Sequence, residues 1–316
     1  MKGFSSGVRT DLAAERYSAL ETDYAKEHAG LPDGIDFSES EECGIRKETV
    51  RITTAAGAER FGKPIGTYET YYTGDLGLLG ERETDAAVGF LARGIRRIAD
   101  TLCHSVSAVL LIGLGNRHIT SDAIGAFTAD RVAVTRHLLG EGAEVFSDGD
   151  ECVSTSVFTP GVVGQTGIET LELCRGAVER TRPDLVLLVD ALAARGTERL
   201  GKTVQICSGG IRPGGGIGNR RCAIDRETLG VPTMTVGVPT VIGTGTLLCD
   251  ALERAEAAAG VLSDAQREAL WQAVDAGDGL FVSPKDTDTV VRTYARLISR
   301  AVNRAFLGTD DFPTVL

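Results

Sequence analysis

Short apolar runs alternate with amphipathic segments along most of the chain, and this alternation predicts the fold class. Residues 86–102 carry apolar side chains at helical spacing, and SAVLLIGLGN (107–116) is a nearly continuous apolar run that ends in glycine. A strand of a parallel sheet has such a composition, because helices cover both of its faces. Two similar runs follow, DLVLLVDA (184–191) and VPTMTVGVP (231–239).

Weaker patterns complete the series. Helices are expected at 11–28, 121–139, 168–180, 246–258, 263–275 and 286–306, and further strands at 47–54, 68–73, 154–160 and 203–208. The acidic run FSESEEC (37–43) is expected to be surface loop, and 55–66 a turn-rich connection. Strands that alternate with helices predict an α/β fold, with a doubly wound, mostly parallel sheet and helices on both faces. No internal repeat or low-complexity linker divides the chain, which favours one domain.

Composition excludes several classes of function. The net charge of −11 over 316 residues would repel a phosphate backbone, so no direct binding of nucleic acid is expected. None of the seven cysteines has C-x-x-C spacing, so neither a zinc site nor a disulfide framework is indicated. The N-terminus lacks the apolar region of a signal peptide, and no apolar run is long enough to span a membrane. A cytoplasmic protein is therefore expected.

Two aspartates follow predicted strands and are the candidate catalytic residues. Asp122 comes shortly after the 107–116 run, at the start of a predicted helix, and Asp190 ends the apolar run LVLLV. The carboxyl ends of strands carry the working groups in open α/β sheets. Structural roles are open for both: Asp122 could cap its helix, and Asp190 could accept hydrogen bonds from loop amides.

Paired carboxylates would suit hydrolysis. When two such groups approach each other, repulsion and burial keep one protonated while the other stays ionised. The ionised group can take a proton from an attacking water, and the protonated one can polarise a carbonyl. His137 is the rival candidate, although its place near a predicted helix C-terminus is favourable for electrostatic reasons alone.

Two glycine-rich loops could bring backbone close to a ligand. GLGNRH (113–118) begins like a dinucleotide-binding fingerprint, but His118 stands where its third glycine belongs. RPGGGIGNRR (212–221) could either be a surface loop or allow a polypeptide to lie against the protein.

Several of these segments together resemble the spore germination proteases. The resemblance is carried, in order along the chain, by VRTDLAAE (8–15), GLGNRHITSDAIG (113–125), VTRHLL (134–139), PGVVGQTGIET (160–170), LVDALAAR (188–195), RPGGGIGNRR (212–221), ETLGVP (227–232) and VGVPTVI (236–242). It implies an atypical aspartic endopeptidase of the spore core that degrades small acid-soluble spore proteins during germination. It also implies an α/β fold shared with hydrogenase-maturation endopeptidases, and no cofactor or metal.

The resemblance also implies roles for particular residues. Asp122 and Asp190 match the family's proposed catalytic pair. The matched motifs contain the residues expected to bind substrate or support the site: Asn116, His137, Thr166, Glu169, Arg195, Gly214, Gly216 and Asn219. Family members are homotetrameric zymogens that cleave themselves after a glutamate. The matching bond is Glu15–Arg16, which would leave residues 1–15 as a propeptide and 16–316 as the peptidase domain.

Three other interpretations remain open at this level. One is a metal-dependent peptidase like those of hydrogenase maturation, which would need a histidine and a second acid placed to hold the metal. Another is a nucleotide-binding α/β protein that uses the GLGN loop. The last is a catalytically inactive protein that only binds spore proteins, against which the presence of both aspartates argues.

Overall fold

The computed structural model describes residues 10–24, 33–139, 153–214, 222–259, 263, 265–266, 269–270, 272 and 279–309. Its strands are β1 (Ile35–Glu42), β2 (Ile45–Ile52), β3 (Gly66–Tyr72), β4 (Ala108–Gly113), β5 (Ser154–Phe158), β6 (Leu185–Ala194), β7 (Thr203–Cys207), β8 (Thr233–Gly243) and β9 (Phe281–Val282). Its main helices are α1 (Ala13–Tyr24), α2 (Ala55–Phe61), α3 (Glu81–Leu102), α4 (Ile124–Ala129), α5 (Arg136–Leu139), α6 (Val163–Thr166), α7 (Thr170–Thr181), α8 (Arg226–Leu229), α9 (Thr244–Ala259) and α11 (Thr287–Leu307).

One mixed sheet runs through the molecule, in the order β1-β2-β3-β7-β8-β6-β4-β5, with β9 paired to β8. Its parallel part consists of β5, β4, β6 and β8, and these include the three apolar runs recognised in the sequence. The remaining strands extend the sheet in antiparallel fashion. The expected α/β class is confirmed, with the parallel strands forming the part that carries the candidate aspartates.

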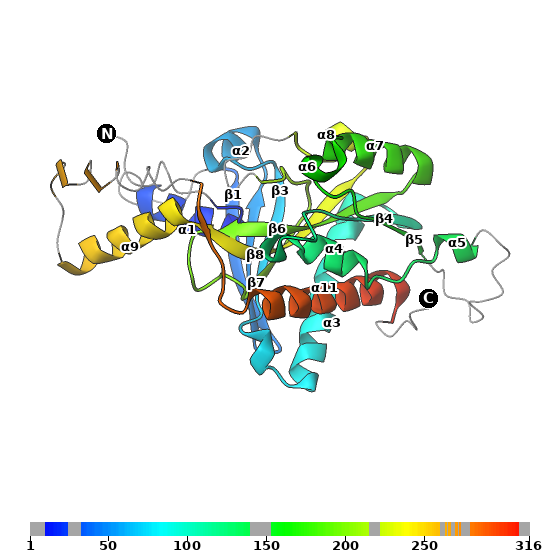
Figure 1. Cartoon of the computed structure of the whole chain (residues 1–316), viewed down its shortest axis with the longest axis horizontal. Coiled ribbons are helices and arrows are strands. Elements are labelled where there is room, and N and C mark those ends of the chain that lie inside the picture. Colours follow the sequence, from blue (N-terminus) through cyan, green and yellow to red (C-terminus); the bar gives the residue numbers. More distant parts are fainter. Residues whose placement is uncertain are drawn as a thin grey trace.

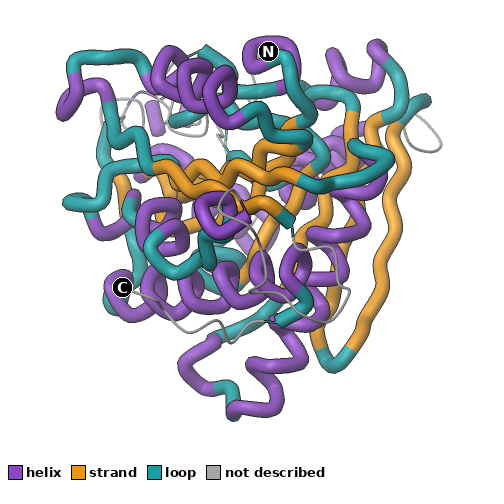
Figure 2. Tube along the Cα trace, turned by 90° about the vertical axis from the view of Figure 1, so that its right-hand side faces the viewer, coloured by secondary structure: helices purple, strands orange, loops and turns teal. Residues whose placement is uncertain are grey.

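Helices cover both faces of the parallel part (Figure 1). On one face α3 packs against α11, and α11 packs against α4. On the other face α7 packs against β4 and α8. In Figure 2 the strands run between these two layers of helices.

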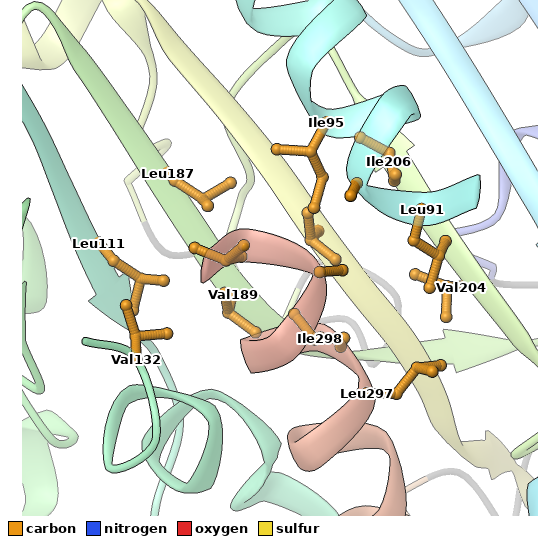
Figure 3. Close-up of a cluster of buried hydrophobic side chains, with 14 of the residues drawn as sticks. Leu91, Ile95, Leu111, Val132, Leu187, Val189, Val204, Ile206, Leu297 and Ile298 are labelled. Atoms are coloured by element: carbon orange, nitrogen blue, oxygen red, sulfur yellow. The ribbon is translucent and has the colours of Figure 1, made fainter. Parts of the chain in front are cut away.

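The larger core fills the face covered by α3, α4 and α11 (Figure 3). Alternate residues of β6, such as Leu187 and Val189, point into it, with Val189 near Ile298 of α11, while Leu91 of α3 lies beside Val204 of β7 in the same core. Val186 and Leu188 point to the opposite face, where they meet Cys174 of α7. Because side chains alternate along a strand, the neighbouring residues of β6 with odd numbers face the larger core and those with even numbers face α7.

The acidic run expected to be loop is an edge strand. β1 pairs with β2 from Ile35↔Ile52 to Glu42↔Ile45, and most of its side chains are exposed. Only Ile35 and Phe37, at the start of the strand, pack into a hydrophobic cluster, so the acidic remainder lacks the apolar alternation that identifies strands in a sequence. Cys43 and Gly44, both with positive φ, form the turn between the two strands.

Two further expectations were wrong. The connection at 55–66 contains α2, whose first turn is capped by the Thr54 side chain and whose end is closed by Gly62 in the left-handed conformation. The helix expected at 121–139 is broken into η3 (Thr120–Asp122), α4 and α5. The break follows from Thr135, whose buried hydroxyl donates to Val153 O at 2.6 Å and accepts from Thr155 N at 2.8 Å. These bonds tie the chain to the edge of the sheet.

The helix expected at 263–275 lies largely outside the described residues. Among the helices that the structure describes, none has the length and apolar character needed to cross a membrane.

Candidate active site

Asp122 lies in the loop after β4, where its carboxylate is held by backbone. The Asn116 amide donates a hydrogen bond of 2.7 Å to Asp122 Oδ2, and the Asp122 amide donates to Ile119 O at 2.8 Å. Gly115 has a φ of +94°, and a Cβ at this position would overlap with the Asp122 carbonyl oxygen. Only glycine allows the loop to fold back this closely.

The loop is also anchored to the neighbouring strands. The Thr240 hydroxyl in β8 donates to Ser121 O at 2.6 Å. Gly125 of α4 lies so close to the carbonyl oxygens of Leu114 and Val189 that a Cβ would overlap with both. The backbone around Asp122 is therefore fixed against β4, β6 and β8.

Asp190 lies within β6 and is only 5% exposed. The strand continues to Ala194, so the expectation that Asp190 ends it was wrong; a register shift between Leu192 and Ala193 lets it continue along β8. The Ala191 amide donates to Asp190 Oδ1 at 2.9 Å. By alternation Asp190 faces the side of Leu188, away from the larger core.

Asp122 lies in the loop that follows β4, and Asp190 lies within β6, the strand parallel to β4 beside it. Gly113, the last residue of β4, pairs with Val189, and the Leu114 amide donates to Val189 O at 2.8 Å. The chain therefore leaves β4 level with Asp190 and then forms the loop that carries Asp122. This is the edge at which open α/β sheets place their functional groups.

A pocket of about 750 Å³ lies on the same face of the sheet. It begins at Gly237, which pairs with Asp190 on one side and with Gln205 of β7 on the other. A Cβ at Gly237 would stand 2.6 Å from Leu192 Cγ, so glycine at this position lets the Leu192 side chain pack directly against β8. The wall farther from Asp190 is formed by Arg16, Lys63, Tyr68, Cys207, Thr233, Thr235 and Arg212, among others.

Burial shifts the ionisation of groups in this wall. It lowers the pKa of Lys63, an effect that nearby Asp11 opposes, and it raises the pKa of the Cys207 thiol. Burial also raises the pKa of the Tyr68 hydroxyl. The Cys207 thiol and the Tyr68 hydroxyl are therefore protonated near neutral pH, and burial disfavours the charged form of Lys63.

The N-terminal segment lies at the rim of the pocket. The Asp11 amide donates to Ala193 O at 2.9 Å, and Asp11 Oδ2 accepts from the Ala193 amide at 2.9 Å. Gln205 completes the attachment: its Oε1 accepts from the Ala13 amide at 2.8 Å and its Nε2 donates to Asp11 O at 3.2 Å. These contacts join residues more than 180 positions apart in the sequence.

Glu15 is buried at 3% exposure in the first turn of α1. Its carboxylate accepts the amides of Arg195 at 2.7 Å and Gly196 at 2.8 Å, as well as the Thr10 hydroxyl. The Arg199 guanidinium stands 3.9 Å away. Burial nevertheless raises the pKa of Glu15 above 4.5, against the opposing effect of these partners.

Of the residues predicted to support the site, Asn116 lies beside Asp122, and its Oδ1 accepts from Gln165 Nε2 at 2.8 Å. Thr166 ends α6 next to this contact, and Glu169 precedes α7. The Arg195 side chain turns away from Asp190 to α9, where it pairs with Glu253 and lies 3.6 Å from Asp250.

His137 is not brought to the aspartates. It is exposed on α5, and α5 is tied to the first half of β5 because the Thr135 amide donates to Thr155 O at 3.1 Å. Gly214 has a positive φ at the end of a described segment. Gly216 and Asn219 lie outside the described residues.

Four residues that the sequence did not single out take part in this architecture: Gln165, Arg199, Gln205 and Thr240. Thr240 and Gln165 stand within motifs that were recognised, so their neighbours pointed to them. Arg199 and Gln205 gave no signal, because their partners are distant in the sequence. In the described part of the chain, no group of three or more His, Cys, Asp or Glu side chains is placed to hold a metal ion.

With Asp122 in the loop after β4, Asp190 within β6 and a pocket on the face of the sheet that Asp190 shares, the candidate site lies at the carboxyl ends of the parallel strands of an α/β protein. The family model for germination protease, peptidase A25, matches residues 11–257, which include both aspartates. The chain belongs to the germination protease family, and it is a protease.

Similar proteins extend over nearly the whole chain. The germination protease of Caldanaerobacter subterraneus subsp. tengcongensis is 37% identical over 95% of this chain and 94% of its own length. Those of Halalkalibacterium halodurans and Clostridium perfringens are 33% and 34% identical, each over 94% of this chain. Among solved structures, the [NiFe] hydrogenase maturation protease HycI of Thermococcus kodakarensis is 16% identical, with a TM-score of 0.33, over 66% of this chain and 99% of that one. Such a score is too low to assign a fold, so the α/β class rests on the sheet described above.

Proposed function

We propose that this protease is an aspartic endopeptidase in which Asp122 and Asp190 act as a pair. The observation that supports the proposal is their position at the same edge of adjacent parallel strands, one within a backbone-anchored loop and the other 5% exposed. Carboxylates in unequal environments separate into one that is ionised and one that is protonated. The ionised carboxylate takes a proton from water as it attacks the peptide carbonyl. The protonated one donates a hydrogen bond to the carbonyl oxygen and then its proton to the leaving amine.

The proposed substrates are the small acid-soluble proteins of the spore core, degraded during germination. The pocket beside Gly237 supports a polypeptide substrate, because it is about 750 Å³ and lies next to Asp190. A pocket of that size holds several side chains of an extended chain. The family's role in spores gives the location, and the sequence resemblance gives the substrate.

We also propose that the chain is made as a zymogen that cleaves its own Glu15–Arg16 bond and assembles as a homotetramer. Residues 16–316 would then form one α/β peptidase domain. Both residues of the bond lie in the first turns of α1, and Glu15 is buried. A helical bond cannot enter an active site as an extended strand, so this segment must leave its place before it is cut.

Asp122→Asn and Asp190→Asn test the catalytic assignment. Each variant keeps the side-chain shape but removes the ionisable group, so cleavage of a purified small acid-soluble spore protein is expected to fall by about 10²- to 10⁴-fold. Asp130→Asn is the matched control, because Asp130 makes an exposed ion pair with Arg117. Circular dichroism would show that all three proteins are folded. Cleavage at close to the wild-type rate by either site variant would remove that aspartate from the mechanism.

A further inference from the structure

Thr10–Glu15, here called the docked segment, is held by a compact set of partners. Its backbone pairs with Ala193 through the Asp11 amide, and Gln205 binds both Asp11 O and the Ala13 amide. Gln205 is itself 5% exposed, so its amide group is aimed at the segment from within the sheet. A buried amide side chain that satisfies both a donor and an acceptor of a foreign backbone is a typical way to recognise a peptide.

Leu12 adds an apolar contact. It is 0% exposed and lies in a cluster with Leu192, Ala194 and Ile242, against which Leu200, Ile211 and Leu247 also pack. Burial of the whole leucine side chain favours docking through the hydrophobic effect. The cluster would present an open apolar hollow if the segment were absent.

Glu15 adds a polar contact three residues later. Its two carboxylate oxygens receive two consecutive backbone amides, those of Arg195 and Gly196, while Arg199 stands behind them. Arg199 is kept in place by Tyr72, whose hydroxyl accepts from Arg199 Nε at 2.9 Å. The carboxylate niche is thus built mainly from backbone and from a side chain with its own supports, and it does not depend on the segment for its shape.

We propose that the end of β6, residues 192–196 together with Gln205 and Arg199, is a peptide-binding site. Its ligand is a peptide with an apolar side chain followed three residues later by a carboxylate. In this structure the chain's own docked segment occupies it. The site binds that sequence through contacts that do not require the Glu15–Arg16 bond, so a free peptide of residues 10–15 binds in the same place.

The position of this site gives the binding a consequence, which rests on the proposed self-cleavage. Asp11 of the docked segment lines the pocket that also includes Gly237, the residue paired with Asp190. A segment that remains bound after the bond is cut would still narrow this entrance. Departure of the peptide, rather than the cut alone, would then open the pocket.

The experiment uses the full chain with its own segment undocked. In Leu12→Ala/Glu15→Ala the apolar and carboxylate contacts are both lost, and hydrogen exchange at the Arg195 and Gly196 amides should report the empty niche. A fluorescently labelled peptide TDLAAE is then titrated and followed by anisotropy. We expect it to bind this variant at least 10-fold more tightly than wild type, where the site is filled. If the double variant does not fold, the smaller change Glu15→Ala takes its place. The peptide should bind Glu15→Ala more tightly than wild type but less tightly than is expected for the double variant.

Peptide and protein controls isolate the contacts. TDLAAA lacks the carboxylate and TDEAAE lacks the apolar side chain, so each should bind the variant at least about 10-fold more weakly than TDLAAE. Glu21 is an exposed carboxylate on the same helix, so Glu21→Ala should bind TDLAAE as weakly as wild type does. Equal binding of the three peptides, or no binding of TDLAAE to a protein whose niche amides exchange freely, would overturn the proposal. Because the readout is binding, it is independent of whether Asp122 and Asp190 catalyse cleavage.

Discussion

At the scale of single residues, the candidate site depends on backbone as much as on side chains. The backbone amide of Asn116, not its side chain, donates the hydrogen bond that holds the Asp122 carboxylate. The backbone amide of Ala191 does the same for Asp190. Glycine at 115 provides the close approach to Asp122 that the first of these contacts requires. The sequence identified the two aspartates and Asn116. It could not show the amides, because any residue can supply one.

Gly115→Ala tests how strongly this loop positions Asp122. A left-handed backbone costs alanine about 1–2 kcal/mol, and its Cβ would overlap with the Asp122 carbonyl oxygen, so the loop must move. We expect proteolytic activity to fall at least about 10-fold with only a modest loss of stability. Gly164→Ala is the control, since that position has ordinary φ and open space around it. Unchanged activity in Gly115→Ala would show that the position of Asp122 is not critical.

Glu15 should make stability depend on pH. Burial raises its pKa above 4.5 in the folded protein, so folding takes up a proton there. Its contribution is fully present below pH 4.5 and is lost as the pH rises through the raised pKa. The free energy of unfolding of wild type, measured relative to Glu15→Gln by urea denaturation, should therefore decrease as the pH rises through that range. Glu21→Gln should follow wild type, and a difference that grows with pH would mean that the pKa is lowered instead.

At the scale of elements, the buried ones were predictable and the exposed ones were not. β4, β6 and β8 each contain a nearly continuous run of buried, mostly apolar residues, so composition alone identified them. β1 gave no signal because all of its residues after Phe37 are exposed. The helix α2 is short, although Thr54 and Gly62 mark its ends. The break between α4 and α5 depends on Thr135 binding β5, a contact that no local pattern reveals.

α11 links the core to the site, because it packs on α3, on α4 and on the short helix that contains Asp122. Ile298 of α11 is 1% exposed in the larger core. Ile298→Ala should lower the free energy of unfolding by about 2–5 kcal/mol, through lost burial and the cavity that remains. Val134→Ala, at a site 45% exposed, should change it by less than about 0.5 kcal/mol. Chemical denaturation measures the free energy of unfolding of both variants. Similar losses of this free energy in the two variants would contradict the packing of α11 described above.

At the scale of the whole molecule, the N-terminal docked segment is bound to the C-terminal end of β6 and to Gln205 of β7. The sequence indicated a propeptide only through family resemblance. Its attachment joins Glu15 to Arg195 and Ala13 to Gln205, pairs that are 180 and 192 residues apart. Contacts at such separation leave no periodicity in the sequence.

Self-processed protein is expected to begin at Arg16. Cleavage at this bond requires release of the docked segment, so Leu12→Ala, which weakens docking, should speed the appearance of the new N-terminus several-fold. Sequencing of the N-terminus over time at mildly acidic pH provides the measurement, with Asp190→Asn as the variant expected not to process. A new terminus elsewhere would contradict the proposed bond.

The exposed strand β1 has a consequence for the protein in concentrated solution. It is the outer strand of the described sheet, and its side chains include the carboxylates of Asp36, Glu39, Glu41 and Glu42. An unpaired strand edge invites other chains to add to it, and closely spaced like charges oppose that addition. Two copies meeting edge to edge would bring together the Asp36 and Glu41 carboxylates, besides Glu39 and Glu42, which pair with Arg46 and Arg93 of their own chain. The acidic run that concealed the strand in the sequence thus protects the protein against aggregation through its sheet.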